Sequence, residues 1–264
     1  LDKGNKNYLS KNLKNLIKIN SKIIEVGSGT CQLSNYFAIG TNMEVVAFDT
    51  TLESIKLGKN FSDNNQIKNI KFVNGDIFDD IFEDEYFDVV WTNGVLHHTA
   101  NPKKAFETCA KWLKPGGYVV LGLYNYYGRL RTNFRQVMYK LLGKKIGESY
   151  IKIFDPILRE KKKSKESINA WIQDQYDHPI ESKHTFNEVF QWFDENKIQP
   201  ICTIPSLKMY DYKNEIFEDF YNKIIKSEKK NFLDKFNEIM IQILMNFNKF
   251  GDDGGLFIVI GKKN

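Results

Sequence analysis

The first 125 residues of the chain alternate between short apolar runs and amphipathic stretches, and this rhythm constrains the fold more than any other feature. Short apolar runs separated by helix-length segments are typical of parallel strands joined by crossover helices. The expected strands are residues 22–26, 44–48, 70–73, 87–91 and 118–123. The expected helices are residues 31–39, 52–61 and 102–113. The pattern therefore predicts an α/β fold with a mostly parallel sheet.

Beyond residue 125 the alternation gives way to helical segments. Residues 125–184 are basic and aromatic without a clear strand, and residues 207–250 form a second helical stretch. Between them, Thr185 and Glu188 form a capping box that predicts a helix start. Two further strands are expected, at 198–204 and 256–260. We predict one domain over residues 1–264, a Rossmann-like seven-stranded sheet whose two helical insertions cap a substrate site.

Composition narrows the class of protein. Hydrophobic residues make up 42% of the chain, so it can form a sizeable core. The three cysteines, Cys31, Cys109 and Cys202, are isolated in sequence, which argues against a disulfide framework or a zinc site. No apolar run reaches the roughly 18–20 residues that cross a bilayer, and the first residues do not resemble a secretion signal. We therefore expect a cytoplasmic protein with no membrane span and no bound metal.

The basic residues are unevenly distributed. The formal net charge is +5, yet residues 126–165 hold twelve lysines and arginines against three acids. All four arginines of the chain lie there, at Arg129, Arg131, Arg135 and Arg159. Arginine binds carboxylates and phosphates in a bidentate manner that lysine cannot match. This region is interpreted either as an anion-binding surface or as a solvated basic face.

The segment 23–31, Ile-Ile-Glu-Val-Gly-Ser-Gly-Thr-Cys, predicts a ligand-binding turn between a strand and a helix. Gly27 and Gly29, on either side of Ser28, let the backbone turn sharply and approach a ligand without an obstructing Cβ atom. The helix that follows would present backbone N–H groups. Because nicotinamide and flavin sites use similar turns, the motif alone does not identify the ligand.

Polar residues follow the next three expected strands. Asp49 and Thr50 end the second strand, where a carboxylate can accept both hydroxyls of a ribose. Asp76 ends the third, where an acid can accept an adenine amino group while Ile77 packs on the base. Asn93 follows the fourth strand. Carboxyl ends of parallel strands share one edge, so these residues are expected to surround one adenosine-containing ligand.

Five ordered motifs in residues 20–125 resemble class I S-adenosylmethionine (SAM) dependent methyltransferases, in particular the small-molecule group that includes ubiquinone-biosynthesis enzymes. The motifs are Glu-x-Gly-x-Gly, the acid after strand two, Gly-Asp-Ile, Leu-His-His and Leu-Lys-Pro-Gly-Gly. The resemblance implies that Glu25 and the backbone of residues 27–29 hold the methionine part of SAM. It implies that Asp49 holds the ribose, Asp76 and Ile77 the adenine, and that Asn93 faces the sulfonium end.

One residue departs from the family's motif, because the third glycine of the turn is Cys31 here. Cysteine is small, so we expect a slight shift in packing and continued binding of SAM.

Methyl transfer from SAM requires mainly that nucleophile, methyl carbon and sulfur are held in line. A general base is needed only when the nucleophile carries a proton. His97 and His98 follow the fourth strand, and we expect His97 to be structural and His98 to act in the site. His178 is the second candidate base, in the polar segment 174–184.

Aromatic and basic residues that follow the fifth strand are the candidates for acceptor binding. The expected acceptor-binding residues are Tyr124, Tyr126, Arg129, Arg131, Tyr176 and His184. Rings and guanidinium groups together would suit a small, anionic acceptor methylated on oxygen or nitrogen.

Three other classes of function stay open. An RNA or protein methyltransferase would use the basic insertion to bind its substrate. A methyltransferase acting on exocyclic base amines is disfavoured, because the chain lacks Asn/Asp-Pro-Pro-aromatic after strand four. An NAD-dependent oxidoreductase is disfavoured because no Tyr-x-x-x-Lys sequence occurs. A non-catalytic interaction protein is the third alternative.

Overall fold

The computed structural model describes residues 20–79, 81–160, 164–177, 179–207, 232–247 and 255–264. Seven strands form one sheet in the order β3-β2-β1-β4-β5-β7-β6. The strands are β1 (Lys22–Val26), β2 (Glu44–Asp49), β3 (Ile70–Asn74), β4 (Phe87–Asn93), β5 (Leu113–Tyr124), β6 (Ile198–Ile204) and β7 (Leu256–Lys263). Strand β7 runs antiparallel to both β5 and β6, and the pairs among β1 to β5 are parallel. The predicted α/β, mostly parallel, seven-stranded sheet is confirmed.

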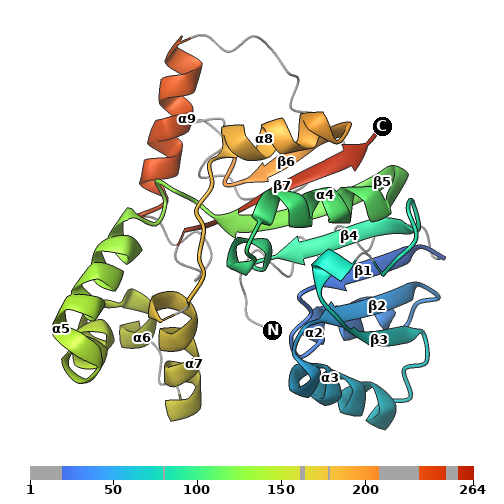
Figure 1. Cartoon of the computed structure of the whole chain (residues 1–264), viewed down its shortest axis with the longest axis horizontal. Coiled ribbons are helices and arrows are strands. Elements are labelled where there is room, and N and C mark those ends of the chain that lie inside the picture. Colours follow the sequence, from blue (N-terminus) through green and yellow to red (C-terminus); the bar gives the residue numbers. More distant parts are fainter. Residues whose placement is uncertain (1–19, 80, 161–163, 178, 208–231, 248–254) are drawn as a thin grey trace.

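Helices cover both faces of the sheet (Figure 1). They are α2 (Gln32–Ala38), α3 (Leu52–Asn64), α4 (Pro102–Trp112) and α8 (Phe186–Glu195). Alternate residues of the strands point to opposite faces, so Ile24 joins the core beneath α4 and α8 while Ile23 joins the core beneath α2. This alternation gives the three layers that hold the strand ends in place.

The strand β5 begins earlier than predicted, directly after α4. Its first residues include Lys114-Pro115-Gly116-Gly117, which precede the expected strand of residues 118–123. Leu113 already pairs with Phe87 of β4, and the register then shifts before Tyr118 pairs with Val89. The Pro-Gly-Gly segment thus follows the helix and is an irregular part of the strand.

Helices occur in both stretches where insertions were predicted. Residues 125–184 contain α5 (Leu130–Phe154), α6 (Pro156–Glu160) and α7 (Lys165–Tyr176), and α9 (Phe232–Leu244) lies in the second stretch. The helices α5, α6 and α7 lie together beyond the carboxyl ends of the parallel strands (Figure 1). Buried Asp155 ties them together, since one of its oxygens accepts hydrogen bonds from Trp171 Nε1 and the Tyr176 hydroxyl, each at 2.8 Å. Their predicted role as a cap over the substrate stays a prediction.

In the described ranges, no helix has both the length and the apolar character needed to cross a bilayer. The cytoplasmic location stays a prediction.

Candidate active site

The turn after β1 is fixed by the end of β2. Gly27 and Gly29 have φ angles of 71° and 51°, in the left-handed region that favours glycine. The carbonyl of Phe48 accepts hydrogen bonds from the N–H groups of Gly27 and Ser28, and the Asp49 carboxylate accepts one from Gly29 N at 2.7 Å. The backbone of residues 27–29 was expected to hold the methionine part of SAM, and these three N–H groups are bonded within the protein. The turn therefore offers open space at Gly29, where an added Cβ atom would have no neighbour within 4 Å, whereas a Cβ atom at Gly27 would lie 2.3 Å from Val95 Cγ2.

The second oxygen of the Asp49 carboxylate accepts a hydrogen bond from Thr51 N, at 2.7 Å. Two backbone donors hold the half-buried carboxylate in one orientation at the end of β2. A carboxylate has about four acceptor positions, so two remain for the hydroxyls of a ribose. Thr50 is exposed beside it. The geometry fits the ribose-binding role that the sequence implied.

The two residues assigned to the adenine differ in exposure. Asp76 is exposed, and its carboxylate caps the short helix η1 (Ile77–Asp79) by accepting from Phe78 N at 3.0 Å. Ile77 is only 6% exposed, because its side chain packs in the core that contains Phe48. Asp76 is therefore accessible to a ligand, whereas little of Ile77 is available to stack on a base.

The carboxylate of Glu25 lies at the start of α2. One of its oxygens accepts hydrogen bonds from the backbone N–H of Ser34, at 2.8 Å, and from the Ser34 hydroxyl. Burial raises the pKa of Glu25 from its ordinary value to about 7, although the Ser34 hydrogen bonds oppose this shift and nearby Asp49 adds to it. A cation placed beside this carboxylate would offset its burial, as the ammonium group of SAM would do.

The side chain of Asn93 depends on a glycine in the neighbouring strand. A Cβ atom added at Gly122, its partner in β5, would lie 1.8 Å from Asn93 Oδ1. Within the described residues this buried oxygen has no hydrogen-bond partner. An orphaned acceptor at the end of β4 is a position where a bound ligand can supply the missing donor.

Taken together, these residues fit SAM. The open surface at Gly29, the oriented Asp49, the buried Glu25 and the orphaned Asn93 oxygen all lie at the carboxyl ends of β1, β2 and β4 or in the turns that follow them. This is the edge at which open α/β sheets bind nucleotides.

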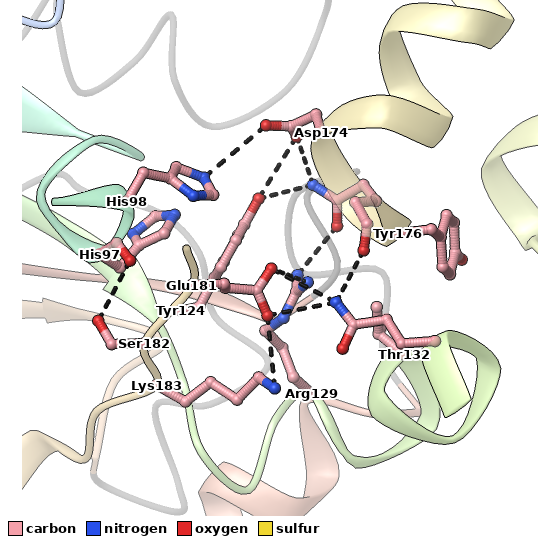
Figure 2. Close-up of polar contacts among 12 residues, drawn as sticks. His97, His98, Tyr124, Arg129, Thr132, Asp174, Tyr176, Glu181, Ser182 and Lys183 are labelled. Atoms are coloured by element: carbon pink, nitrogen blue, oxygen red, sulfur yellow. Dashed lines mark hydrogen bonds and ion pairs between the residues drawn. The ribbon is translucent and has the colours of Figure 1, made fainter. Parts of the chain in front are cut away.

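A second group of polar residues lies beside this edge, where α7 meets the short helix η2 (Leu96–His98) (Figure 2). His98 Nδ1 is 3.1 Å from the carbonyl oxygen of Ile180, and His98 Nε2 is 3.8 Å from Asp174 Oδ1. A carbonyl can only accept, so Nδ1 carries a proton and Nε2 is the atom that gains or loses one. Asp174, whose side chain is 49% exposed, would stabilise the protonated ring.

The ring of Tyr124 lies between His97 and Arg129 (Figure 2). Its centroid is 3.8 Å from that of His97 and 3.6 Å from the guanidinium carbon of Arg129. Its hydroxyl accepts a hydrogen bond from Gln175 Nε2 at 2.6 Å and lies 3.5 Å from Asp174. Burial raises the pKa of Tyr124, with Arg129 opposing this effect, so the phenol stays protonated at neutral pH. His97 is fully buried here, and its structural role stays a prediction.

Arg129 is fully buried and forms an internal ion pair. Its guanidinium donates to Glu181 Oε2 and to Gln175 Oε1, each at 2.9 Å. Lys183 lies 3.4 Å from the other oxygen of Glu181. The sequence suggested that Arg129 would receive an anionic acceptor, but its charge is already matched by a carboxylate of the chain.

The side chains of the other predicted acceptor residues make contacts of their own, although the His184 backbone N–H donates to the carbonyl of Tyr124 at 2.8 Å. Arg131 donates to the backbone carbonyl of Asn246, beyond α9, at 2.9 Å. Tyr176 bonds Asp155 and Arg135 among α5, α6 and α7, and Tyr126 is 53% exposed. His184 is buried between Ser182 and Glu188. His178 lies outside the described residues.

Sequence reasoning missed Asp174, Gln175 and Glu181 as individual site residues. The available signal was the density of polar groups in residues 174–184, which marked the segment without separating inward from outward side chains. Ser182 fixes that segment, since its backbone N–H donates to the carbonyl of His97 at 2.8 Å. This contact places Ser182 beside His97, so two segments that are far apart in the chain contribute to one site.

The sheet order, the antiparallel β7 and the ligand edge define the class I SAM-dependent methyltransferases. The model of the family described as "Methyltransferase domain" matches residues 17–237, and the chain belongs to this family. The sequence-based prediction of a class I methyltransferase, with SAM as the cofactor, is confirmed at the level of the family.

Curated relatives carry quinone-related names. A demethylmenaquinone methyltransferase of Staphylococcus haemolyticus is 29% identical over 191 residues, covering 69% of this chain and 72% of that protein. The ubiquinone/menaquinone biosynthesis C-methyltransferase UbiE of Proteus mirabilis is 27% identical, with 40% and 43% covered. The match spans 49% of the demethylmenaquinone methyltransferase of Renibacterium salmoninarum.

A solved structure supports the fold. PKMT2 from Rickettsia typhi in complex with AdoHcy superimposes with a TM-score of 0.64 at 15% identity, covering 93% of this chain and 49% of that one. At this identity the likeness concerns the fold alone.

Proposed function

We propose that this chain transfers the methyl group of SAM to a small molecule that carries an ionisable hydroxyl group, at the ends of β4 and β5. The observation that carries the proposal is the His98–Asp174 pair, 3.8 Å apart, beside the Tyr124 hydroxyl. A hydroxyl must lose its proton to become a good nucleophile, and an imidazole backed by a carboxylate can accept that proton. His98 is the proposed base, and Asp174 stabilises the resulting imidazolium.

In the proposed cofactor site, Glu25 faces the ammonium group of SAM and Asp49 accepts from the ribose. Asp76 accepts from the adenine amino group, and Asn93 lies toward the sulfonium end. When SAM is bound it supplies an electrophilic methyl group with a good leaving group. The residues of the chain then orient the acceptor and remove its proton, while α5, α6 and α7 cap the site.

The methyl group is proposed to go to the oxygen of the acceptor. A second outcome has specific support, because a relative from Proteus mirabilis is named a C-methyltransferase. Removing the proton of a ring hydroxyl also makes the adjacent ring carbon nucleophilic, so the same base would serve either atom. Nuclear magnetic resonance of the product made with labelled SAM distinguishes the two.

A nucleic-acid acceptor is the less favoured alternative. Three of the four arginines in the basic region contact other parts of the chain: Arg129 bonds Glu181, Arg131 bonds Asn246 and Arg135 bonds Tyr176. These contacts reduce the number of arginines available to phosphates. Methylation of RNA or of protein in a labelled-SAM assay, with none of small molecules, would contradict the proposal.

The test of the base compares His98→Gln and Asp174→Asn with Asp177→Asn, an exposed acid three residues further on. Acceptors with an ionisable hydroxyl are screened first with labelled SAM. We expect His98→Gln to lower kcat by about 10²–10⁴-fold, with SAM affinity nearly unchanged. Asp174→Asn should have a smaller effect and Asp177→Asn none. His178→Gln belongs in the same series, because it was the other candidate base. Full activity of His98→Gln would remove this residue from the mechanism.

A further inference from the structure

The first part of α5 turns several polar groups inward, beside the buried ring of Tyr139, and an apolar stripe outward. Its inward face carries polar groups: Gln136 donates to the carbonyl of Gln175 at 2.8 Å, and Arg135 donates to the Tyr176 hydroxyl at 3.0 Å. The side chain of Thr132 is buried on the same face of the helix as Arg135 and Gln136. An ordinary surface helix turns its apolar side chains toward the core and its polar ones toward water.

The outward face of α5 is apolar. Leu130, Phe134, Val137 and Leu141 are spaced by four, three and four residues, so they form one stripe along the helix. Their exposed fractions are 47%, 63%, 53% and 75%. Phe247, which follows α9, is 70% exposed, and the centroid of its ring lies 5.8 Å from the guanidinium carbon of Arg131 of α5. Contiguous exposed apolar residues of this kind mark an interaction surface.

The charges around this stripe have one sign. Arg131, Lys140, Lys144 and Lys145 are exposed along α5 or just past Gly143, where the helix is interrupted. The only acid in α5 is Glu148, which pairs with Lys152. An apolar stripe flanked by cationic side chains is the pattern of helices that lie in the interface of an anionic bilayer.

We propose that α5 docks on an anionic membrane surface, with the stripe Leu130–Phe134–Val137–Leu141 inserted between headgroups and the flanking lysines on phosphate or carboxylate groups. The apolar side chains supply burial and the cations supply attraction to the surface. This inference stands apart from the proposed reaction, since it rests on the exposed face of α5 and not on the residues around His98.

Charge disfavours a second copy of the chain as the occupant. Two α5 faces brought together would place Lys140, Lys144 and Lys145 opposite the same cations of the partner, and like charges in an interface are repulsive. An acidic protein would also pair with these cations, so the experiment must distinguish a protein partner from a lipid surface.

The test is co-sedimentation of the full chain with vesicles of phosphatidylcholine and phosphatidylserine, compared with vesicles of phosphatidylcholine alone. We expect binding to the anionic vesicles that weakens at high salt. The double variant Phe134→Ser/Leu141→Ser should bind at least about tenfold more weakly. The matched control is Leu57→Ser/Phe61→Ser, on exposed positions of α3, which should bind as the parent does.

SAM affinity measured by calorimetry and the thermal unfolding temperature show whether each variant is folded. Absence of binding to anionic vesicles by the parent chain would overturn the proposal. It would also be overturned if the Phe134/Leu141 variant bound as well as the parent, since attraction by charge alone would then explain binding. A parent chain that self-associates through this face in light scattering, and ignores vesicles, would assign the surface to a second copy.

Discussion

The side chain of Cys31 occupies the space that a side chain at Gly58 would need. A Cβ atom added at Gly58 of α3 would lie 2.5 Å from both Cβ and Sγ of Cys31. Cys31 itself has a left-handed backbone, with φ 57° and ψ 29°, at the position where the motif ordinarily has glycine. The missing side chain of Gly58 leaves room for the side chain of Cys31, so the two positions form a pair.

This pairing predicts a non-additive double-mutant cycle. Gly58→Ala should destabilise the protein by about 1–3 kcal/mol, because the new methyl group overlaps the Cys31 side chain. In a Cys31→Gly background the cost should fall by about 1 kcal/mol, with a remainder because the Thr30 carbonyl oxygen is also close, at 2.9 Å. Urea unfolding measures each variant. Asn60→Ala, exposed on the same helix, should cost the same in both backgrounds, and additivity for Gly58 would contradict the pairing.

Cys31 and Gly58 also show how much of the turn after β1 could be predicted from the sequence. The glycines and the strand pattern placed the turn correctly, since local sequence decides where a backbone can reverse. The packing of Cys31 could not be predicted from the sequence. The residue that leaves room for it, Gly58, is distant in sequence and has no side chain that would indicate a contact. The sequence also did not indicate that the N–H groups of residues 27–29 donate hydrogen bonds to Phe48 and Asp49.

The raised pKa of Glu25, about 7, predicts that stability falls as the pH rises. Between its ordinary value of 4.5 and about 7, the folded protein holds a proton on Glu25 that the unfolded chain has lost. Folding therefore takes up a proton in this window, and the free energy of unfolding decreases by up to about 1.4 kcal/mol per pH unit. Glu25→Gln should remove this slope. Urea unfolding at several pH values checks it, and an unchanged slope would contradict the assignment.

The same carboxyl group predicts a pH dependence of SAM binding. The ammonium group of SAM favours the ionised carboxylate, so affinity should rise with pH until about 7 and then level off. At pH 6, binding should release about one proton. Calorimetry in buffers of different ionisation enthalpy counts this proton directly. Glu25→Gln should bind SAM more weakly at pH 8 and release no proton, and a proton count equal to that of the parent would exclude Glu25 as its source.

Asp49→Ala should weaken SAM binding without unfolding the protein. The carboxylate is oriented by Gly29 N and Thr51 N, each at 2.7 Å, and its remaining positions suit two ribose hydroxyls. Hydrogen bonds to a charged group contribute about 1.5–3 kcal/mol, so affinity should fall by about tenfold to a hundredfold. Asp63→Asn, an exposed acid near the end of α3 that pairs with Lys59, is the control and should leave affinity nearly unchanged. Unaltered SAM affinity in a folded Asp49→Ala protein would rule out the proposed cofactor site.

The arginines show why the acceptor side was harder to predict than the cofactor side. The cofactor residues follow successive strands, so the order of the strands places them at one edge. Arg129 was expected to bind an anionic acceptor, because arginine suits carboxylates. The anion is Glu181, which the fold brings to it from a segment beyond α7. A sequence does not reveal whether a charge is matched by a ligand or by a distant residue of its own chain.

Arg129→Met should therefore lower the stability of the protein more than it weakens the binding of an acceptor. It leaves the carboxylate of Glu181, whose side chain is 8% exposed, without its guanidinium partner. Removing one member of a buried pair costs about 3–5 kcal/mol, which chemical unfolding would register as a lower midpoint. In the double variant Arg129→Met/Glu181→Met the only charge left of this group is that of Lys183, whose side chain is partly exposed, so much of this loss should be recovered. Lys183→Met removes the more exposed cation beside Glu181 and should cost less. A stable Arg129→Met protein with a raised KM for an anionic acceptor would instead show that the guanidinium receives the substrate.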